Sequence, residues 1–142
     1  MLKIVVVDGQ GGGIGSLIVK KVRDLFNESV EVIALGTNAA ATSAMLKARA
    51  NRGATGENAI VLNAGRCDLI VGPLSIVVAN SMMGELTPEM AEAIGTSQAR
   101  KILLPLNQEG IDVVGASKEP LPHMVDSMIA LIEKIKDLME VR

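Results

Sequence analysis

The glycine-rich run from Asp8 to Gly15 constrains the fold of this chain more than any other feature. It reads Asp-Gly-Gln-Gly-Gly-Gly-Ile-Gly and follows directly on the apolar residues 2–7. An apolar helical pattern resumes immediately after it. Residues without a Cβ expose their backbone N–H groups, and at a helix N-terminus these groups attract anions. The pattern predicts a strand, a tight loop and a helix, with the loop as a cradle for a phosphate-bearing ligand.

Hydrophobic periodicity outlines the rest of the secondary structure. One helical pattern separates the apolar runs at 2–7 and 30–35, which indicates a right-handed βαβ unit. Residues 75–83 are either helical or irregular. Further strands are predicted at 68–71 and 102–106. Helices are predicted at 14–26, 39–50, 55–64 (capped by Thr55), 87–94 and 122–141.

The order of these elements predicts an α/β fold. We expect a single doubly wound, three-layer domain over residues 1–142, Rossmann-like or flavodoxin-like, with a mostly parallel sheet of about five strands. The connection at 107–110 is too short for a crossover helix. Residues 111–114 therefore either pair antiparallel with the strand at 102–106 or form a short edge.

Composition excludes several classes of partner. The 14 basic and 16 acidic residues give a net charge of −2, so no basic field exists for nucleic acid or an anionic membrane. The apolar runs are far shorter than the roughly 20 residues of a membrane span. The first residues predict a strand rather than a secretion signal, and the single Cys67 cannot form an internal disulfide. The expected compartment is a reduced cytoplasm.

The glycine run departs from the strict patterns of phosphate-binding loops. In the G-x-G-x-x-G fingerprint, either Ile14 or Ser16 stands where the last glycine belongs. The spacing of Gly9, Gly13 and Gly15 is that of short-chain dehydrogenases, but a chain without tyrosine lacks their catalytic residue. Hydride transfer by that mechanism is excluded. A Walker A loop would have lysine after its final glycine, where this chain has Ser16.

Ligands of open α/β sheets bind outside the carboxyl ends of the strands. We therefore predict a site at the ends of the first two strands, where Thr37 and Asn38 also begin a helix and can cap it. Residues 72–75 and the pair Asn107 and Gln108 reach the same edge. A nucleotide or a dinucleotide fits the loop, and the identity of the cofactor stays open. The predicted phosphate-binding set is Gly9, Gln10, Gly11, Gly12, Gly13, Ile14, Gly15, Gly36, Thr37 and Asn38.

Two carboxylates are candidate catalytic residues. Asp8 ends the first strand, and Glu57 lies in a segment, 53–58, that can fold over the same edge. Either side chain could act as a general acid or base on a phosphorylated substrate. Stabilisation of a helix start explains Glu57 without any chemistry. No metal site is predicted, because His123 is the only histidine and Cys67 the only cysteine.

Two resemblances add to these predictions. The stretches 8–15, 34–38 and 54–59 resemble a family of short, uncharacterised bacterial proteins. That resemblance covers nearly the whole chain and implies a stand-alone domain without a known activity. The pairs Gly36-Thr37 and Gly56-Glu57 are similar to methylglyoxal synthase-like domains, and this likeness implies a phosphate-gripping loop and a catalytic Glu57. Those enzymes have a histidine after the first strand, where this chain has Asp8-Gly9-Gln10.

Three functions stay open on the sequence alone. The first is a binding protein for a nucleotide or another phosphorylated small molecule. The second is a small enzyme, such as a methylglyoxal synthase-like lyase, and the third is an interaction protein whose glycine loop is purely structural. No nucleic-acid or membrane partner is expected.

We also expect a homodimer, because a domain this small cannot enclose every apolar residue. The last helix docks on the sheet through an apolar stripe of Met128, Ile132, Ile135, Leu138 and Met139. The excess apolar residues are 76–79 together with Met82, Met83 and Leu86. An exposed patch of this kind drives association.

Overall fold

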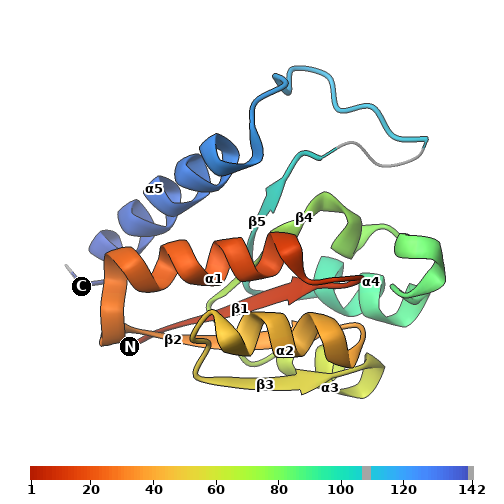
Figure 1. Ribbon diagram of the computed structural model, residues 1–142, viewed down its shortest axis with the longest axis horizontal. Coiled ribbons are helices and arrows are strands. Elements are labelled where there is room, and N and C mark those ends of the chain that lie inside the picture. Colours follow the sequence, from red (N-terminus) through yellow and green to blue (C-terminus); the bar gives the residue numbers. More distant parts are fainter. Residues whose placement is uncertain (107–109, 141–142) are drawn as a thin grey trace.

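Five parallel strands form one sheet in the computed structural model, which describes residues 1–106 and 110–140 (Figure 1). Every strand pairs in parallel with its neighbours, in the order β3-β2-β1-β4-β5. This order confirms the predicted α/β class and places β1 at the centre. The strands are β1 (Leu2–Asp8), β2 (Val30–Gly36), β3 (Arg52–Thr55), β4 (Leu69–Pro73) and β5 (Arg100–Leu104).

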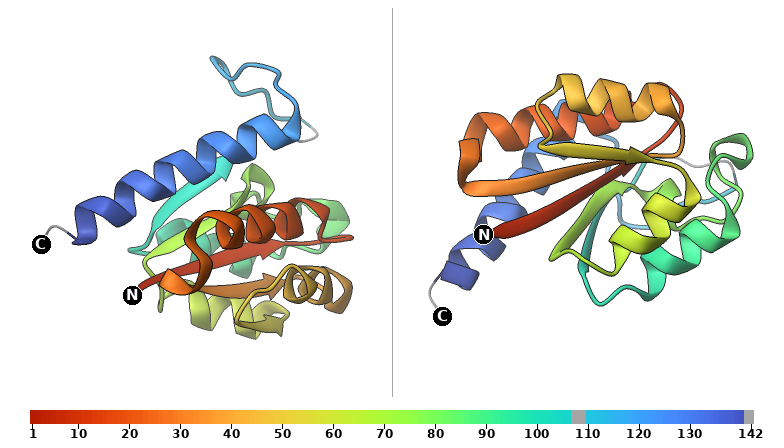
Figure 2. Two further views of the ribbon diagram at one scale, coloured as in Figure 1. Left: turned by 60° about the vertical axis from the view of Figure 1, so that its left-hand side comes forward. Right: turned by 90° about the horizontal axis from the view of Figure 1, so that it is seen from below.

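Helices cover both faces of the sheet, as a doubly wound fold requires. Figures 1 and 2 show α1, α2 and α5 on one face, with α3 and α4 on the other. Short 3₁₀ turns lie at Asn27–Ser29, Leu74–Val77 and Met82–Gly84. The helices are α1 (Gly13–Phe26), α2 (Ala39–Lys47), α3 (Glu57–Ala64), α4 (Pro88–Thr96) and α5 (Leu121–Glu140).

Two hydrophobic cores flank the sheet because successive side chains of a strand point to opposite faces. In β1, Ile4 and Val6 belong to the core under α1 and α5, whereas Val5 and Val7 belong to the core under α3 and α4. All four side chains are essentially inaccessible to solvent. The near-continuous apolar run at 2–7 is therefore a strand buried on both faces, as predicted.

The fifth strand is not the one that the sequence predicted. Residues 111–114 form no strand beside β5, and Val114 is 99 % exposed. The reason is the direction of the chain: α5 begins beside the carboxyl end of β5, where Met124 and Leu106 line one hollow. An antiparallel strand would return the chain to the opposite end of the sheet. Residues 110–120 instead lie outside the sheet and lead to the start of α5 (Figure 1).

The edge strand β3 was not predicted from the sequence. Its four residues pair with the free edge of β2, from Ile33 opposite Arg52 to Gly36 opposite Thr55. Thr55 therefore belongs to a strand and does not cap α3, whose N-cap is Gly56. A Cβ on Gly53 would lie 2.9 Å from Cγ2 of Thr42, so α2 can cross β3 closely only above a glycine.

Other expectations are partly confirmed. Thr87 caps α4 as predicted, with Met90 N–H donating to its hydroxyl. Residues 75–83 are irregular, with short 3₁₀ turns. In the apolar set proposed for a dimer, Ile76 and Leu86 are fully buried in the core, so they cannot form a contact surface. The predicted end of the last helix at residue 141 lies outside the described residues.

The apolar stripe of α5 is also shorter than predicted. Ile132 is fully buried, whereas Leu138 is 67 % exposed and Met139 40 % exposed. The helix continues beyond the region where α1 and the sheet can cover it (Figure 2). None of the described helices is long and apolar enough to cross a membrane.

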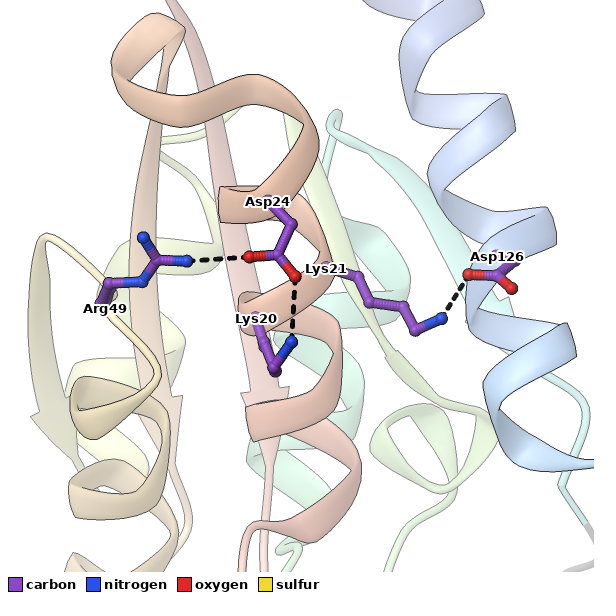
Figure 3. A network of polar contacts seen from close by, with 5 residues as sticks. All are labelled: Lys20, Lys21, Asp24, Arg49 and Asp126. Atoms are coloured by element: carbon purple, nitrogen blue, oxygen red, sulfur yellow. Dashed lines mark hydrogen bonds and ion pairs between the residues drawn. The ribbon is translucent and has the colours of Figure 1, made fainter.

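Charged side chains tie the helices of one face together (Figure 3). Lys21 of α1 donates to Asp126 of α5. Asp24 of α1 accepts from Lys20 and from Arg49, each at 3.0 Å. These pairs lie at the surface, where solvent weakens ion pairs. They link neighbouring helices and contribute little to the stability of the fold.

Candidate functional site

The carboxyl edge of the sheet brings together most of the residues that the sequence singled out. Asp8 ends β1 opposite Gly36, which ends β2, and Thr37 N–H donates to the carbonyl oxygen of Asp8. The strand order reverses between β1 and β4, which is where open α/β sheets bind ligands. The glycine loop therefore lies at the predicted end of the sheet.

Asp8 caps α1 from inside the protein. Its two carboxylate oxygens accept from Gly9 N–H at 2.8 Å and from Gly15 N–H at 2.7 Å. The residue is 3 % exposed, and burial raises the pKa of its carboxyl group against the lowering effect of the N–H groups of Gly15, Gly9 and Ile14. An internal carboxylate thus takes part of the anion-binding capacity that the sequence assigned to a ligand.

Contacts within the protein explain why three of the five loop positions are glycine. Gly12 has a left-handed φ of 75°, and a Cβ there would lie 2.8 Å from the backbone of Ala41. A Cβ on Gly15 would lie 2.6 Å from Sδ of Met45. A Cβ on Gly9 would lie 2.5 Å from Oγ1 of Thr37 and 2.4 Å from Sδ of Met82. Close packing therefore explains part of the glycine content without a ligand.

The other two glycines face open space. A Cβ on Gly11 or Gly13 would have no heavy atom within 4 Å, and neither residue has a left-handed backbone. Among the described residues, the N–H groups of Gly11 and Gly13 donate to no protein acceptor. This part of the loop leaves room for another molecule to approach the backbone closely.

The carboxylate of Glu85 collects the donors that the sequence predicted for a phosphate. Its Oε1 accepts from Thr37 Oγ1 at 2.7 Å, from Asn38 Nδ2 at 2.8 Å and from Gln10 N–H at 2.8 Å. These hydrogen bonds lower the pKa of Glu85, with the Gln10 N–H as the largest contribution. Three donors from the loops after β1 and β2 therefore converge on one negatively charged oxygen.

Asn38 has two functions in this arrangement. Its Oδ1 accepts from Ala41 N–H at 2.9 Å, so it caps α2 as predicted. Its Nδ2 donates to Glu85 and also to the carbonyl oxygen of Gln10 at 2.9 Å. Capping fixes the side chain, and both amide hydrogens point to acceptors at the carboxyl edge.

Glu85 belongs to a segment, residues 78–86, that we call the strap. The strap follows the buried Ile76 and ends at the buried Leu86. Asn80, Met82 and Met83 all have left-handed backbone conformations, with φ between 56° and 66°. Such conformations are strained for residues with side chains and concentrate at functional sites. Gln10 and residues 78–83 line a hollow of about 410 Å³ beside the donors that hold Glu85.

Glu57 lies apart from this cluster. It begins α3, and its Oε1 accepts from the hydroxyl of Thr87, the cap of α4. The contact links the starts of two helices and gives Glu57 a structural function. Ser75 is buried, and its carbonyl oxygen accepts from Ser81 Oγ at 2.6 Å, which attaches the strap. Asn107 and Gln108 lie outside the described residues.

The sequence contains a signal for Glu85, but hydrophobic periodicity does not detect it. No charged residue occurs between Asp68 and Glu85, so Glu85 is the only charge in a long apolar and neutral stretch. An isolated carboxylate in such a segment requires donors. Among the residues that the structure describes, no three His, Cys, Asp or Glu side chains gather in a way that could hold a metal ion.

The fold and the site define a doubly wound α/β protein with a cluster of hydrogen-bond donors around the Glu85 carboxylate at the carboxyl edge. Residues 3–137 match the family described as a domain of unknown function (DUF3842), and the chain belongs to that family. No curated protein matches the chain.

Among solved structures, the chain is similar to a dodecameric FMN-dependent UbiX-like decarboxylase from Escherichia coli O157:H7. The TM-score is 0.46 at 15% sequence identity, over 92% of this chain and 77% of that chain. FMN dependence and dodecameric assembly are properties of that decarboxylase.

Proposed function

We propose that this protein binds a phosphorylated small molecule at the carboxyl edge of its sheet. One observation carries the proposal: Thr37, Asn38 and the Gln10 N–H converge on a single charged oxygen. Hydrogen bonds to a charged acceptor are stronger than those between neutral groups. A cluster that satisfies one carboxylate oxygen has the chemistry to hold an oxygen of a phosphate.

The glycine loop supports the same ligand class. The open N–H groups of Gly11 and Gly13 lie in the turn that leads into α1, where the helix dipole favours negative charge. The hollow of about 410 Å³ beside Gln10 is within the usual range for small-molecule sites. We therefore propose a nucleotide or dinucleotide, with its phosphate on the loop donors.

Binding can be tested by thermal unfolding with inorganic phosphate, pyrophosphate, AMP, ADP, NAD and FMN. We expect at least one phosphate compound to raise the melting temperature. The variant Thr37→Val combined with Asn38→Asp should abolish the shift. The introduced aspartate keeps an acceptor for the α2 cap but has no amide donor for the ligand.

Thr96→Val is the matched control. The Thr96 hydroxyl donates to the carbonyl oxygen of Glu92 on the exposed end of α4. The control should keep the full ligand-induced shift. A panel without any shift, or an unchanged shift in the double variant, would contradict the proposal.

The enzyme alternative has less support. The carboxylate of Asp8 is occupied by two backbone N–H groups, and that of Glu57 by Thr87. A methylglyoxal synthase-like reaction needs a carboxylate that contacts the substrate, and no described contact favours that role for either residue. Binding without chemistry fits the site better.

We further propose that the protein acts as a homodimer in the cytoplasm. Nearly complete exposure of Met83 (98 %) and Val114 (99 %) supports a contact between copies, since such side chains bury readily in an interface. A chain whose single cysteine, Cys67, is free and forms no disulfide suits a reducing compartment.

A further inference from the structure

We propose that Glu85 is an internal competitor for the ligand and that the strap must open before the anion-binding site is filled. The ligand part of this inference rests on the proposed function. The carboxylate of Glu85 occupies the donors of Thr37, Asn38 and Gln10, which a phosphate would need. A ligand and Glu85 cannot use the same three donors together, so the two compete.

The packing around Gly9 shows how tightly the strap is closed. A Cβ on Gly9 would lie 2.4 Å from Sδ of Met82 and 3.1 Å from Oε1 of Glu85. The strap therefore contacts the first residue of the glycine loop directly. No ligand phosphate fits between the strap and Gly9 while these contacts persist.

The strap has the construction of a segment that can open without unfolding the core. Its ends are fixed by Ile76 and Leu86, which are fully buried, and by the hydrogen bond from Asn80 N–H to the Leu86 carbonyl oxygen at 2.8 Å. Between these anchors, Ala79, Asn80, Met83 and Gly84 are exposed. Release of Glu85 and Met82 would free the middle of the strap and leave its ends in place.

Glu85 has no positively charged partner in the described part of the chain that would hold it against a competing anion. Among the described residues, Glu85 forms no ion pair with lysine or arginine, and its donors are all neutral groups. Thus Glu85 is held by hydrogen bonds alone, and a ligand that offers more acceptor oxygens can displace it.

The strap can be tested without any ligand by hydrogen exchange. In Glu85→Gln, we expect faster exchange at the Gln10 amide and across residues 78–86, because the acceptor loses its charge. Glu92→Gln removes the same charge from an exposed position on α4 and should exchange like the wild type. Equal protection of the strap in all three proteins would overturn the inference.

Competition is tested by titration with pyrophosphate. We expect Glu85→Gln to bind pyrophosphate about tenfold more tightly than the wild type, because the closed state of the strap loses one strong interaction. Glu92→Gln should bind pyrophosphate like the wild type. Equal affinities of Glu85→Gln and the wild type would overturn the competition.

The two arms separate this inference from the proposed function. If the strap loosens in Glu85→Gln but neither this variant nor the wild type binds any compound of the phosphate panel, the proposed function fails. Glu85 is then a structural latch, and its role as a competitor is overturned as well. If the wild type and Glu85→Gln bind phosphate with equal affinity although the strap is looser in the variant, the proposed function stands and only the competition by Glu85 is wrong.

Discussion

Gly9 and Gly11 are two residues apart but have opposite surroundings. A Cβ on Gly9 would collide with Met82 and Thr37, whereas a Cβ on Gly11 meets open space. Gly9→Ala should therefore destabilise the protein by about 1–3 kcal/mol, the usual cost of overpacking. Gly11→Ala should change the free energy of unfolding by less than about 0.5 kcal/mol. Urea unfolding of both variants measures the difference, and equal losses would show that the strap does not pack on Gly9.

Asp8 predicts a specific dependence of stability on pH. Burial raises its pKa in the folded protein above the ordinary value of 3.8. The folded protein therefore binds this proton more tightly than the unfolded chain. The stabilisation from Asp8 is fully present below pH 3.8 and is lost as the pH rises through the higher folded pKa.

Comparison with Asp8→Asn isolates this effect. The free energy of unfolding of the wild type minus that of the variant should decrease as the pH rises above 3.8. Urea unfolding at several pH values provides the measurement. A constant or increasing difference would mean that Asp8 has no raised pKa.

At the scale of single residues, the sequence predicted that Gln10, Thr37 and Asn38 lie at one edge of the sheet, but it did not predict their partner Glu85. Thr37 and Asn38 were found because strand ends in parallel sheets meet at one edge. Glu85 could not be found in this way, since its contact with Thr37 joins residues 48 positions apart. Such a contact depends on the path of an irregular segment, which hydrophobic periodicity does not describe.

Among the elements, α5 allows a direct test of which residues attach it. Ile132 is fully buried, and Ile132→Ala should cost about 2–5 kcal/mol through the cavity that it leaves. Leu138 is on the same helix and 67 % exposed, so Leu138→Ala should cost less than about 0.5 kcal/mol. Thermal or urea unfolding distinguishes the two. A large loss for Leu138→Ala would show that another surface covers the end of α5.

The elements that the sequence predicted well are those with a strong period and a buried face. Residues 2–7 and 30–35 are mostly apolar and form β1 and β2. The strand β3 has no such pattern, because Arg52 and Gly53 at an edge need no apolar face. Residues 111–114 show the opposite error. Their apolar composition predicted a strand, but the path to α5 leaves them away from the sheet.

For the whole molecule, self-association is the prediction that most affects function. We expect light scattering at micromolar concentration to give twice the chain mass of 14.9 kDa. Twofold dimers are the commonest assembly, and the exposed Met83 lies on the strap itself. A measured mass of 14.9 kDa would contradict the dimer.

The central position of β1 has a consequence for how the protein is made. The strand β1 leaves the ribosome before both of its neighbours, and it pairs with β2 on one edge and on the other with β4, which begins at Leu69. Until that strand emerges, a growing chain exposes an apolar strand edge, the kind of surface on which chains aggregate. Completion of the sheet centre therefore depends on synthesis of β4, and the nascent chain is most vulnerable before that point.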